Sequence, residues 1–460
     1  MQKRENRSQP MMLTSGNIKK QLMLFSIPIF LGTLLQQLYN VIDAVVAGRL
    51  VSEDALSAIG VSVPIYLLFV SVILGLAIGI TILLAQFFGA KQFEQIKSLI
   101  STMSIFLIVL GLAMAFGGAI LAKPLLQITQ TPAELLDPAA TYLRMVFWGI
   151  PFSILYNLLG AIMRSFGETK MPLYALIVSS IINLVLNIIF VINGGGVIGI
   201  AVSTIIAQAI SGVYLLVQLR KKFPMAIPTK TEFAFNRELL KLSLKICIPI
   251  IIQQLAVFLG MLIVQGFINQ LGNASIGGMT AASRIEAFIL LPVQALGNAL
   301  SIFAGQNIGA NEKDRMKQGT RFGITLSIAI TALLSIILLF WGKGILGLII
   351  GNNEEMIIKG YSYFHICLWF YPINALIYGL GGVLSGVGDT VIAGIHSLAS
   401  ILVKLLVTVL LIGKLGLLSI AIASCMGWCV ASTIVVMRYK GNKWQSKAVA
   451  KKIKIDGDTK

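Results

Sequence analysis

The stretch VSVPIYLLFVSVILGLAIGITILL, residues 61–84, contains no charged side chain. A helix rises about 1.5 Å per residue, so about 20 apolar residues cross the roughly 30 Å hydrocarbon core of a bilayer. Other apolar runs occur at Ile177–Val191 and Ile324–Trp341. The sequence lacks the short alternating segments that are typical of membrane β-barrels. This stretch therefore predicts an all-α polytopic membrane protein.

The composition agrees with a membrane protein. The chain has 460 residues, of which 57% are hydrophobic and only 12% are charged, whereas soluble domains have about 25% charged residues. The net charge of +18 lies mainly in short connections between apolar runs. This pattern sets membrane orientation, and we expect no nucleic-acid partner. The start of the chain, Met1–Gln21, is polar and basic, unlike a cleaved signal peptide.

Apolar periods and turn residues predict twelve spanning helices. We expect a polar, basic connection at Arg220–Arg237 between the sixth and the seventh. The predicted helices are Leu22–Val46, Ala55–Gln86, Ile96–Leu121, Thr141–Met163, Pro172–Ile192, Ile198–Leu219, Leu239–Ile268, Ile276–Phe303, Phe322–Trp341, Tyr361–Val383, Ile392–Ile412 and Leu417–Met437.

The second half of the chain repeats the first. AQFFGAKQFEQIK (Ala85–Lys97) matches GQNIGANEKDRMK (Gly305–Lys317) at a separation of 220 residues. Pro151 and Gly167 match Pro372 and Gly388 at a separation of 221. An even number of helices per half gives both halves the same orientation. We therefore expect two six-helix lobes related by a pseudo-two-fold axis along the membrane normal.

The lobe boundaries follow from the repeat. We expect an N-terminal lobe at residues 1–220, a cytoplasmic linker at 221–238, a C-terminal lobe at 239–440 and a basic cytoplasmic tail at 441–460. Most Lys and Arg residues of the loops fall on the side of both termini. The positive-inside rule therefore places both termini in the cytoplasm, with the protein in the plasma (inner) membrane.

Asp43 is the most informative polar residue, because a carboxylate at membrane depth costs at least about 2.5–3.5 kcal/mol and usually marks an ion or proton path. Gln36, Asn40 and Asp43 recur at helical spacing, with Tyr39 beside them. We expect this stripe to face a protein interior or a cavity, and not lipid. A buried carboxylate that only ties helices together is the alternative.

Two asparagines, Asn183 and Asn187, share a helix face with Ser180. Their amides could form hydrogen bonds between helices. Their oxygens could equally join Asp43 as ligands of a hard cation such as Na⁺. The sequence leaves both alternatives open.

Lys404 lies inside the eleventh predicted helix, at the repeat position of Asn183. It could extend its ammonium toward the membrane interface, or the ammonium could replace a bound cation in the C-terminal lobe. Glu286, at the start of the eighth predicted helix, is expected to form a local ion pair with Arg284 near the outer surface. The four cysteines all lie in apolar runs, so we expect neither a disulfide framework nor a metal cluster.

The nucleotide-binding motifs of enzymes are not convincing here. Gly194–Gly199 fits GxGxxG but follows a membrane helix and not a strand, and no Walker A sequence occurs. We therefore expect no cofactor and no enzymatic activity.

Six motifs together resemble the multidrug and toxic compound extrusion (MATE) family over about Met11–Tyr439. They are QQLYNVIDAVVAGRL, AQFFGAK, RSFGETKMP, NLVLN, GQNIGA and SGVGDT. The resemblance implies a cation-coupled antiporter, in which H⁺ or Na⁺ enters while an organic, often cationic, drug leaves. It also implies a V-shaped pair of lobes and alternating access.

The family's cation site in the N-terminal lobe carries over to Asp43, Asn183, Asn187 and Thr204. Some members have acidic residues in the seventh and tenth helices, where this chain offers Gln253 and Gln254 and no acid near Tyr371. The resemblance therefore favours coupling in the N-terminal lobe.

We expect small organic substrates, Na⁺ or H⁺ and the lipid bilayer as partners of a monomer. The alternatives are a lipid-linked saccharide flippase of the same superfamily and a membrane receptor or scaffold without transport.

Overall fold

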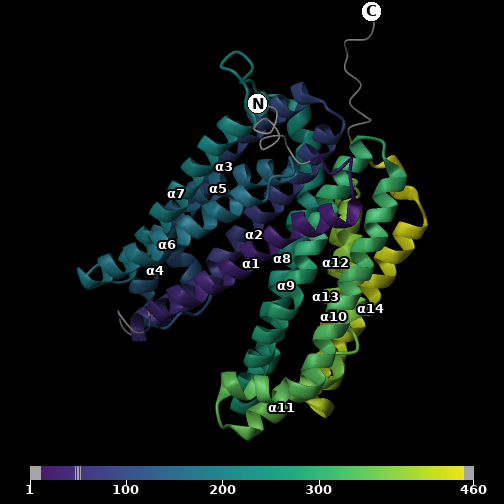
Figure 1. The fold of residues 1–460 in the computed structure, drawn as a ribbon. Coiled ribbons are helices and arrows are strands. Elements are labelled where there is room, and N and C mark those ends of the chain that lie inside the picture. The colour runs from purple at the N-terminus through teal and green to yellow at the C-terminus, as the bar shows by residue number, and fades with distance from the viewer. Residues whose placement is uncertain (1–11, 47, 49–50, 52, 450–460) are drawn as a thin grey trace, which may run out of the picture. The chain divides into compact units, whose positions relative to one another are not determined.

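The computed structural model describes residues 12–46, 48, 51 and 53–449; the side chains of residues 40–46 and 53–55 lie outside this description. All regular elements in these ranges are helices (Figure 1). They are α1 (Ile18–Val46), α2 (Glu53–Gly89), α3 (Phe93–Ile128), α4 (Ala133–Trp148), α5 (Ile150–Ser165), α6 (Lys170–Ile192), α7 (Gly196–Lys222), η3 (Pro224–Ala226), α8 (Arg237–Asn269), α9 (Asn273–Gly309), α10 (Lys313–Ile350), α11 (Glu354–Cys367), α12 (Tyr371–Gly386), α13 (Val391–Leu415), α14 (Leu417–Lys440) and η4 (Lys443–Ser446).

Ten helices of the described chain are long and apolar enough to cross a membrane, or up to twelve when each of two bent pairs counts as one span. This confirms the prediction of an all-α polytopic membrane protein.

The fourth and tenth predicted helices differ from expectation, because each consists of two helices and not one. α4 and α5 meet at an angle of 42°, and α11 and α12 meet at 60°. Pro151 and Pro372 lie in the first turns of α5 and α12. Proline has no backbone N–H and its ring clashes with the preceding turn, so a helix bends or restarts there.

The chain forms two compact units. Unit 1 contains Leu31–Lys245, and unit 2 contains Leu13–Phe30 and Ile246–Lys460. The division falls inside α1 just after Pro28 and inside α8 just before Pro249, two prolines that match each other in the repeat. Each half of the sequence therefore gives its leading segment to the unit that the other half mainly builds.

The segment before α1 is fixed to unit 2 by the guanidinium of Arg315. Nε of Arg315 donates a hydrogen bond to the carbonyl of Leu13 over 3.0 Å, and Nη1 donates to the carbonyl of Gly16 over 2.7 Å. Nη2 donates to the carbonyl of Ser15 and to Oε1 of Gln21. Leu13 is itself fully buried. These bonds explain why the segment Leu13–Phe30 belongs to unit 2.

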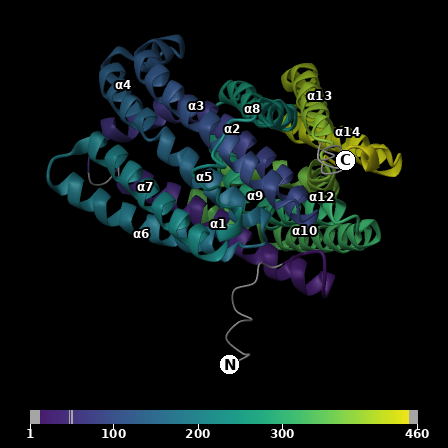
Figure 2. The same cartoon turned by 90° about the horizontal axis from the view of Figure 1, so that it is seen from above.

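The helices of the two units match in length and order. α2 and α9 each have 37 residues, and α6 and α13 begin 221 residues apart. α2 packs on α4 and α5, while α9 packs on α10, α11 and α12. α6 lies beside α7, and α13 lies beside α14, in both Figure 1 and Figure 2.

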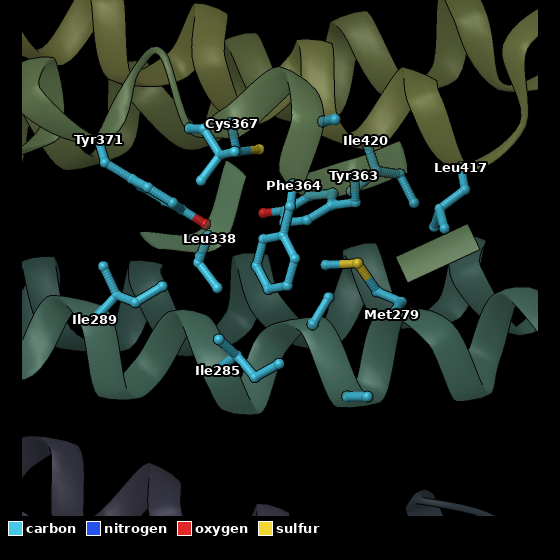
Figure 3. Close-up of a cluster of buried hydrophobic side chains, with 14 of the residues drawn as sticks. Met279, Ile285, Ile289, Leu338, Tyr363, Phe364, Cys367, Tyr371, Leu417 and Ile420 are labelled. Carbon is cyan, nitrogen blue, oxygen red and sulfur yellow. The ribbon is translucent and has the colours of Figure 1, made fainter. Parts of the chain in front are cut away.

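The buried core of unit 2 surrounds α9. Met279, Ile285 and Ile289 of α9 belong to one buried cluster with Leu338 of α10 and Phe364 of α11 (Figure 3). α11 crosses the ends of α9 and α10 (Figure 1). Inside a bilayer such packing is stabilised by van der Waals contact and not by removal from water, because lipid tails are as apolar as the side chains that they replace. In a membrane the same packing places the few polar residues of these helices inside the unit.

Candidate cation and substrate site

The two asparagines of α6 face the inside of unit 1. Asn183 is 1% exposed and Asn187 is fully buried. The opposite face of α6 carries large exposed apolar side chains, among them Ile181 and Val185. A 3.6-residue period separates these two faces, so the asparagines point away from the surface that lipid would cover.

A chain of hydrogen bonds joins three of the predicted site residues. Nδ2 of Asn187 donates to Oδ1 of Asn183 over 2.9 Å, and Nδ2 of Asn183 donates to Oγ1 of Thr204 on α7 over 3.2 Å. The hydroxyl of Thr204 donates to the carbonyl of Ile200 over 3.1 Å. Residues that lie 21 positions apart in sequence therefore form one polar cluster.

Tyr39 extends this cluster to α1. Its hydroxyl donates a hydrogen bond to Oγ1 of Thr204 over 3.3 Å. Gln36, one turn earlier, is exposed. Asn40 and Asp43 belong to the last turns of α1, but their side chains lie outside the described residues. The structure thus brings together Tyr39, Asn183, Asn187 and Thr204.

The cluster offers amide and hydroxyl oxygens, which are the ligand types that hard cations such as Na⁺ prefer. The described part of the chain contains no group of three or more His, Cys, Asp or Glu side chains that could bind a metal. A cation at this cluster would therefore be held by neutral oxygens together with a carboxylate from α1, which is that of Asp43.

The two glutamines and the lysine predicted in the second half all belong to unit 2. Gln253 and Gln254 are half-buried on α8. Lys404 is half-buried in the middle of α13. Its helix neighbours Ser397 and Thr408, seven residues before and four after, are 6% and 0% exposed. Lys404 therefore lies on a buried face.

The prediction for Glu286 is wrong. Glu286 lies well inside α9, and its Oε2 accepts a 3.0 Å hydrogen bond from the hydroxyl of Tyr363. Among the ion pairs of the described residues, none joins Glu286 to Arg284, which is exposed. Sequence reasoning missed the pairing of Glu286 with Tyr363. The available signal was a carboxylate within a long span, which usually has a partner inside the protein.

Ion pairs fix the polar ends of several helices. Lys222 pairs with Glu168 over 2.6 Å, and Arg438 pairs with Asp389 over 2.6 Å. Glu168 and Asp389 occupy equivalent repeat positions. In both units, a loop carboxylate is thus tied to the last span.

The connection between the halves is tied to α3 by Glu232. Lys97 pairs with Glu232 over 2.8 Å, and the backbone N–H of Thr229 donates to the same carboxylate over 2.8 Å. The bond from Lys97 and then those from Thr229 lower the pKa of Glu232 from 4.5 to about 2. The carboxylate therefore stays ionised down to strongly acidic pH.

Comparison with known proteins agrees with these features. The family model MatE matches residues 28–189 and 249–410, which are the two halves of the repeat. The probable multidrug resistance protein YpnP of Bacillus subtilis (strain 168) is 31% identical over 440 residues, covering 94% of this chain and 97% of its own. The probable multidrug resistance protein YoeA of the same organism is 31% identical over 377 residues, covering 80% of each chain.

A solved crystal structure shares the fold. The structure of MATE in complex with MaL6 aligns with a TM-score of 0.87 at 21% identity, covering 94% of this chain and 98% of that one. With the family match over both halves of the repeat, the chain therefore belongs to the MatE family, the multidrug and toxic compound extrusion transporters.

Proposed function

We propose that this membrane protein exports small organic molecules in exchange for Na⁺ or H⁺, and that coupling occurs in unit 1. The observation that carries the proposal is the polar cluster in which the buried Asn183 and Asn187 are joined to the half-buried Thr204 and Tyr39. The names of YpnP and YoeA as probable multidrug resistance proteins support drug-like substrates.

The coupling residue in this proposal is Asp43. It follows Tyr39 by four residues in α1, and positions four apart share one face of a helix. A cation or proton at Asp43 removes the cost of an uncompensated charge at membrane depth. Binding drives transport only when it favours one conformation over another. Neutralising Asp43 therefore shifts the equilibrium between the two conformations. Binding of the organic substrate acts on the same equilibrium.

The polar cluster connects a change of charge in α1 to the neighbouring helices α6 and α7. Thr204 accepts hydrogen bonds from both Tyr39 and Asn183, so a change in the charge at α1 alters how α1, α6 and α7 are held together. In our proposal both termini and the Arg220–Arg237 connection lie in the cytoplasm, following the positive-inside rule. Cations then enter from the outside, and substrates leave toward it.

Transport in proteoliposomes with separately imposed gradients tests this function. The purified chain is reconstituted with a fluorescent organic cation inside the vesicles, and a Na⁺ gradient or a pH gradient is then imposed alone. Export driven by one gradient, and abolished by an ionophore that collapses it, is the expected result. Vesicles that release dye at the same rate without any gradient would contradict antiport. No release under either gradient would contradict export of this substrate class.

A further inference from the structure

The end of unit 2 where α11 crosses α9 and α10 contains an open pocket of about 310 Å³ (Figure 1), which is within the size range of small-ligand sites. The polar residues that line it are Thr280 and Arg284, one turn apart on α9. Ile350, at the end of α10, and Met356, in the first turn of α11, form apolar walls. The pocket therefore combines one positive charge with apolar surroundings.

A close contact between α9 and α11 fixes the position of these walls. A Cβ atom added at Gly278 would lie 2.8 Å from the backbone nitrogen of Gly360, and one added at Gly277 would lie 3.0 Å from Cε of Met356. Small residues let membrane helices approach each other this closely. Gly277 precedes Arg284 by two turns, so the two share a helix face. Met356 is thus held beside the face of α9 that carries Arg284.

The guanidinium of Arg284 has no counter-ion in the part of the chain that the structure describes. The side chain is exposed, and none of the described residues forms an ion pair or a hydrogen bond with its guanidinium. Glu354 and Glu355, in the first turn of α11, are also exposed and do not pair with it. Because an unpaired charge on a membrane span is costly, Arg284 calls for an anion from outside the chain.

The depth of Arg284 matches the phosphate layer of a bilayer. α9 has 37 residues and is about 55 Å long, so when centred on a hydrocarbon core of about 30 Å it extends about 12 Å beyond the core at each end. Arg284 lies eleven residues after the start of α9 at Asn273, which places its Cα about 4 Å inside the core. Helical side chains lean toward the N-terminal end of their helix, and arginine extends to the interface. The guanidinium therefore reaches the boundary between acyl chains and headgroups.

The exposed face of α9 also has the polarity of a lipid. Thr280, Arg284 and Phe288 follow one another at four-residue spacing and are all exposed, Phe288 at 47%. They form one stripe along the helix. The polar and cationic residues lie toward the end of the span, and the aromatic ring lies one turn deeper. A lipid beside this stripe would place its phosphate at Arg284 and its acyl chains at Phe288.

We propose that this pocket binds the phosphate of an anionic phospholipid, with Arg284 as its counter-ion. The guanidinium donates two parallel hydrogen bonds to phosphate oxygens, the geometry for which arginine is suited. Ile350 and Met356 keep water away from this contact and so strengthen it. A zwitterionic headgroup brings a cation of its own, whereas an anionic lipid leaves one net negative charge for Arg284. The site is independent of the proposed antiport.

Lipid binding to the purified chain in a neutral detergent tests this site. Phosphatidylglycerol is titrated in, and bound lipid is counted by mass spectrometry. We expect Arg284→Gln to lose about tenfold in apparent affinity, which corresponds to about 1.4 kcal/mol. Thr280→Phe keeps the charge but fills the pocket and should lose binding as well. Arg321→Gln removes an exposed arginine near the other end of α10 and is the matched control, expected to bind as the wild type does.

Two further probes identify the ligand. Phosphatidylcholine and inorganic phosphate, each at the concentration at which phosphatidylglycerol saturates the wild type, should neither bind detectably nor displace it. Equal binding of phosphatidylcholine would overturn the charge requirement, and displacement by inorganic phosphate would show a site for a free anion instead.

Wild-type affinity in Arg284→Gln, or an equal loss in Arg321→Gln, would refute a specific lipid site. If Arg284→Gln misfolds, as seen by size-exclusion chromatography, Thr280→Phe decides, and wild-type affinity in that variant refutes the pocket. Because the readout is lipid binding and not export, a chain that fails to export can still confirm this site.

Discussion

The hydroxyl of Tyr39 donates a hydrogen bond to Oγ1 of Thr204 over 3.3 Å and thereby joins α1 to α7. Thr204 also accepts from Asn183, which in turn accepts from Asn187. One threonine hydroxyl thus lies where three helices of unit 1 meet. A polar contact of this kind inside a membrane protein is worth about 0.6 kcal/mol on average, so its role is to position groups more than to stabilise the fold.

The first prediction tests this contact. Tyr39→Phe and Thr204→Val each remove one partner with little change in shape, and we expect a three- to tenfold loss of apparent affinity for the coupling cation with normal folding. The measurement is the cation dependence of export in proteoliposomes. The control is Tyr214→Phe, because that hydroxyl makes only a weak contact with the sulfur of Met171, at 3.6 Å in the same unit. Equal effects in all three variants would refute a special role for Tyr39 and Thr204.

The second prediction concerns Asp43. Asp43→Asn keeps the size of the side chain and removes its charge, so the protein should fold but lose gradient-driven export, because neither Na⁺ nor H⁺ can then bind differentially to the two conformations. The control is Asp314→Asn, at an aspartate whose side chain is 93% exposed. Wild-type export rates in Asp43→Asn would eliminate Asp43 as the coupling residue.

The fold was largely predictable because membrane spans have a strong sequence signal. Apolar runs and the repeat identified the all-α class, and the motif pairs at separations of 220 and 221 recur as matched helices. The breaks at Pro151 and Pro372 were not predicted, since a proline can either kink a helix or restart it, and the packing of the surrounding helices decides.

The candidate site was predictable only in part. Asn183 and Asn187 were found because they share one helix face, and Thr204 because the family motif points to it. The partner of Glu286 could not be found, since Tyr363 lies 77 residues away and no local pattern links the two. Sequence spacing identifies neighbours within a helix, whereas contacts between helices depend on how the helices pack.

The third prediction uses Glu232, whose pKa is lowered to about 2 by the bonds from Lys97 and Thr229. A lowered pKa means that the ionised form stabilises the folded connection. This contribution is complete above the unfolded pKa of about 4.5 and is lost as the pH falls toward 2. In difference infrared spectra of wild type against Glu232→Gln, the carboxylate band should titrate near pH 2.

A second carboxylate variant distinguishes the effect of this ion pair from the effect of removing any surface charge. Glu232→Gln should speed hydrogen exchange in residues 229–236 at neutral pH. Glu238→Gln, at a carboxylate that is 78% exposed and pairs with Lys241, should have little effect there, because water and salt screen exposed ion pairs. A titration midpoint near 4.5 would show that Lys97 does not hold the carboxylate.

The fourth prediction tests orientation. Lys230 is exposed in the connection between the halves, so a cysteine introduced by Lys230→Cys should be accessible to thiol reagents on one side of the membrane only. If the positive-inside rule applies, a membrane-impermeant reagent labels it in opened cells and not in intact ones. Cys247, Cys367 and Cys425 are buried and Cys429 is half-buried, so the unsubstituted protein measures the background labelling. Labelling in intact cells would reverse the proposed topology.

The fifth prediction concerns the close approach of α12 to α9. A Cβ atom added at Gly386 would meet the carbonyl oxygen of Ser301 and lie 2.8 Å from its carbonyl carbon and 3.0 Å from its Cα. These are backbone atoms, which cannot rotate aside as a flexible side chain can. Small residues at such positions let membrane helices approach closely. Gly386→Ala should therefore separate the two helices or distort one of them.

We expect Gly386→Ala to reduce stability by about 1–3 kcal/mol, the usual cost of overpacking, and to lower the thermal unfolding temperature in detergent. The control is Gly344→Ala in α10, where the added Cβ meets no atom within 4 Å. Alanine favours a helix over glycine by about 0.8–1 kcal/mol, so this variant should be as stable as the wild type or slightly more stable. Because both variants add the same methyl group to a helix, a difference in unfolding temperature between them reports the contact with Ser301. Equal unfolding temperatures would show that α9 and α12 have room to accept the methyl group.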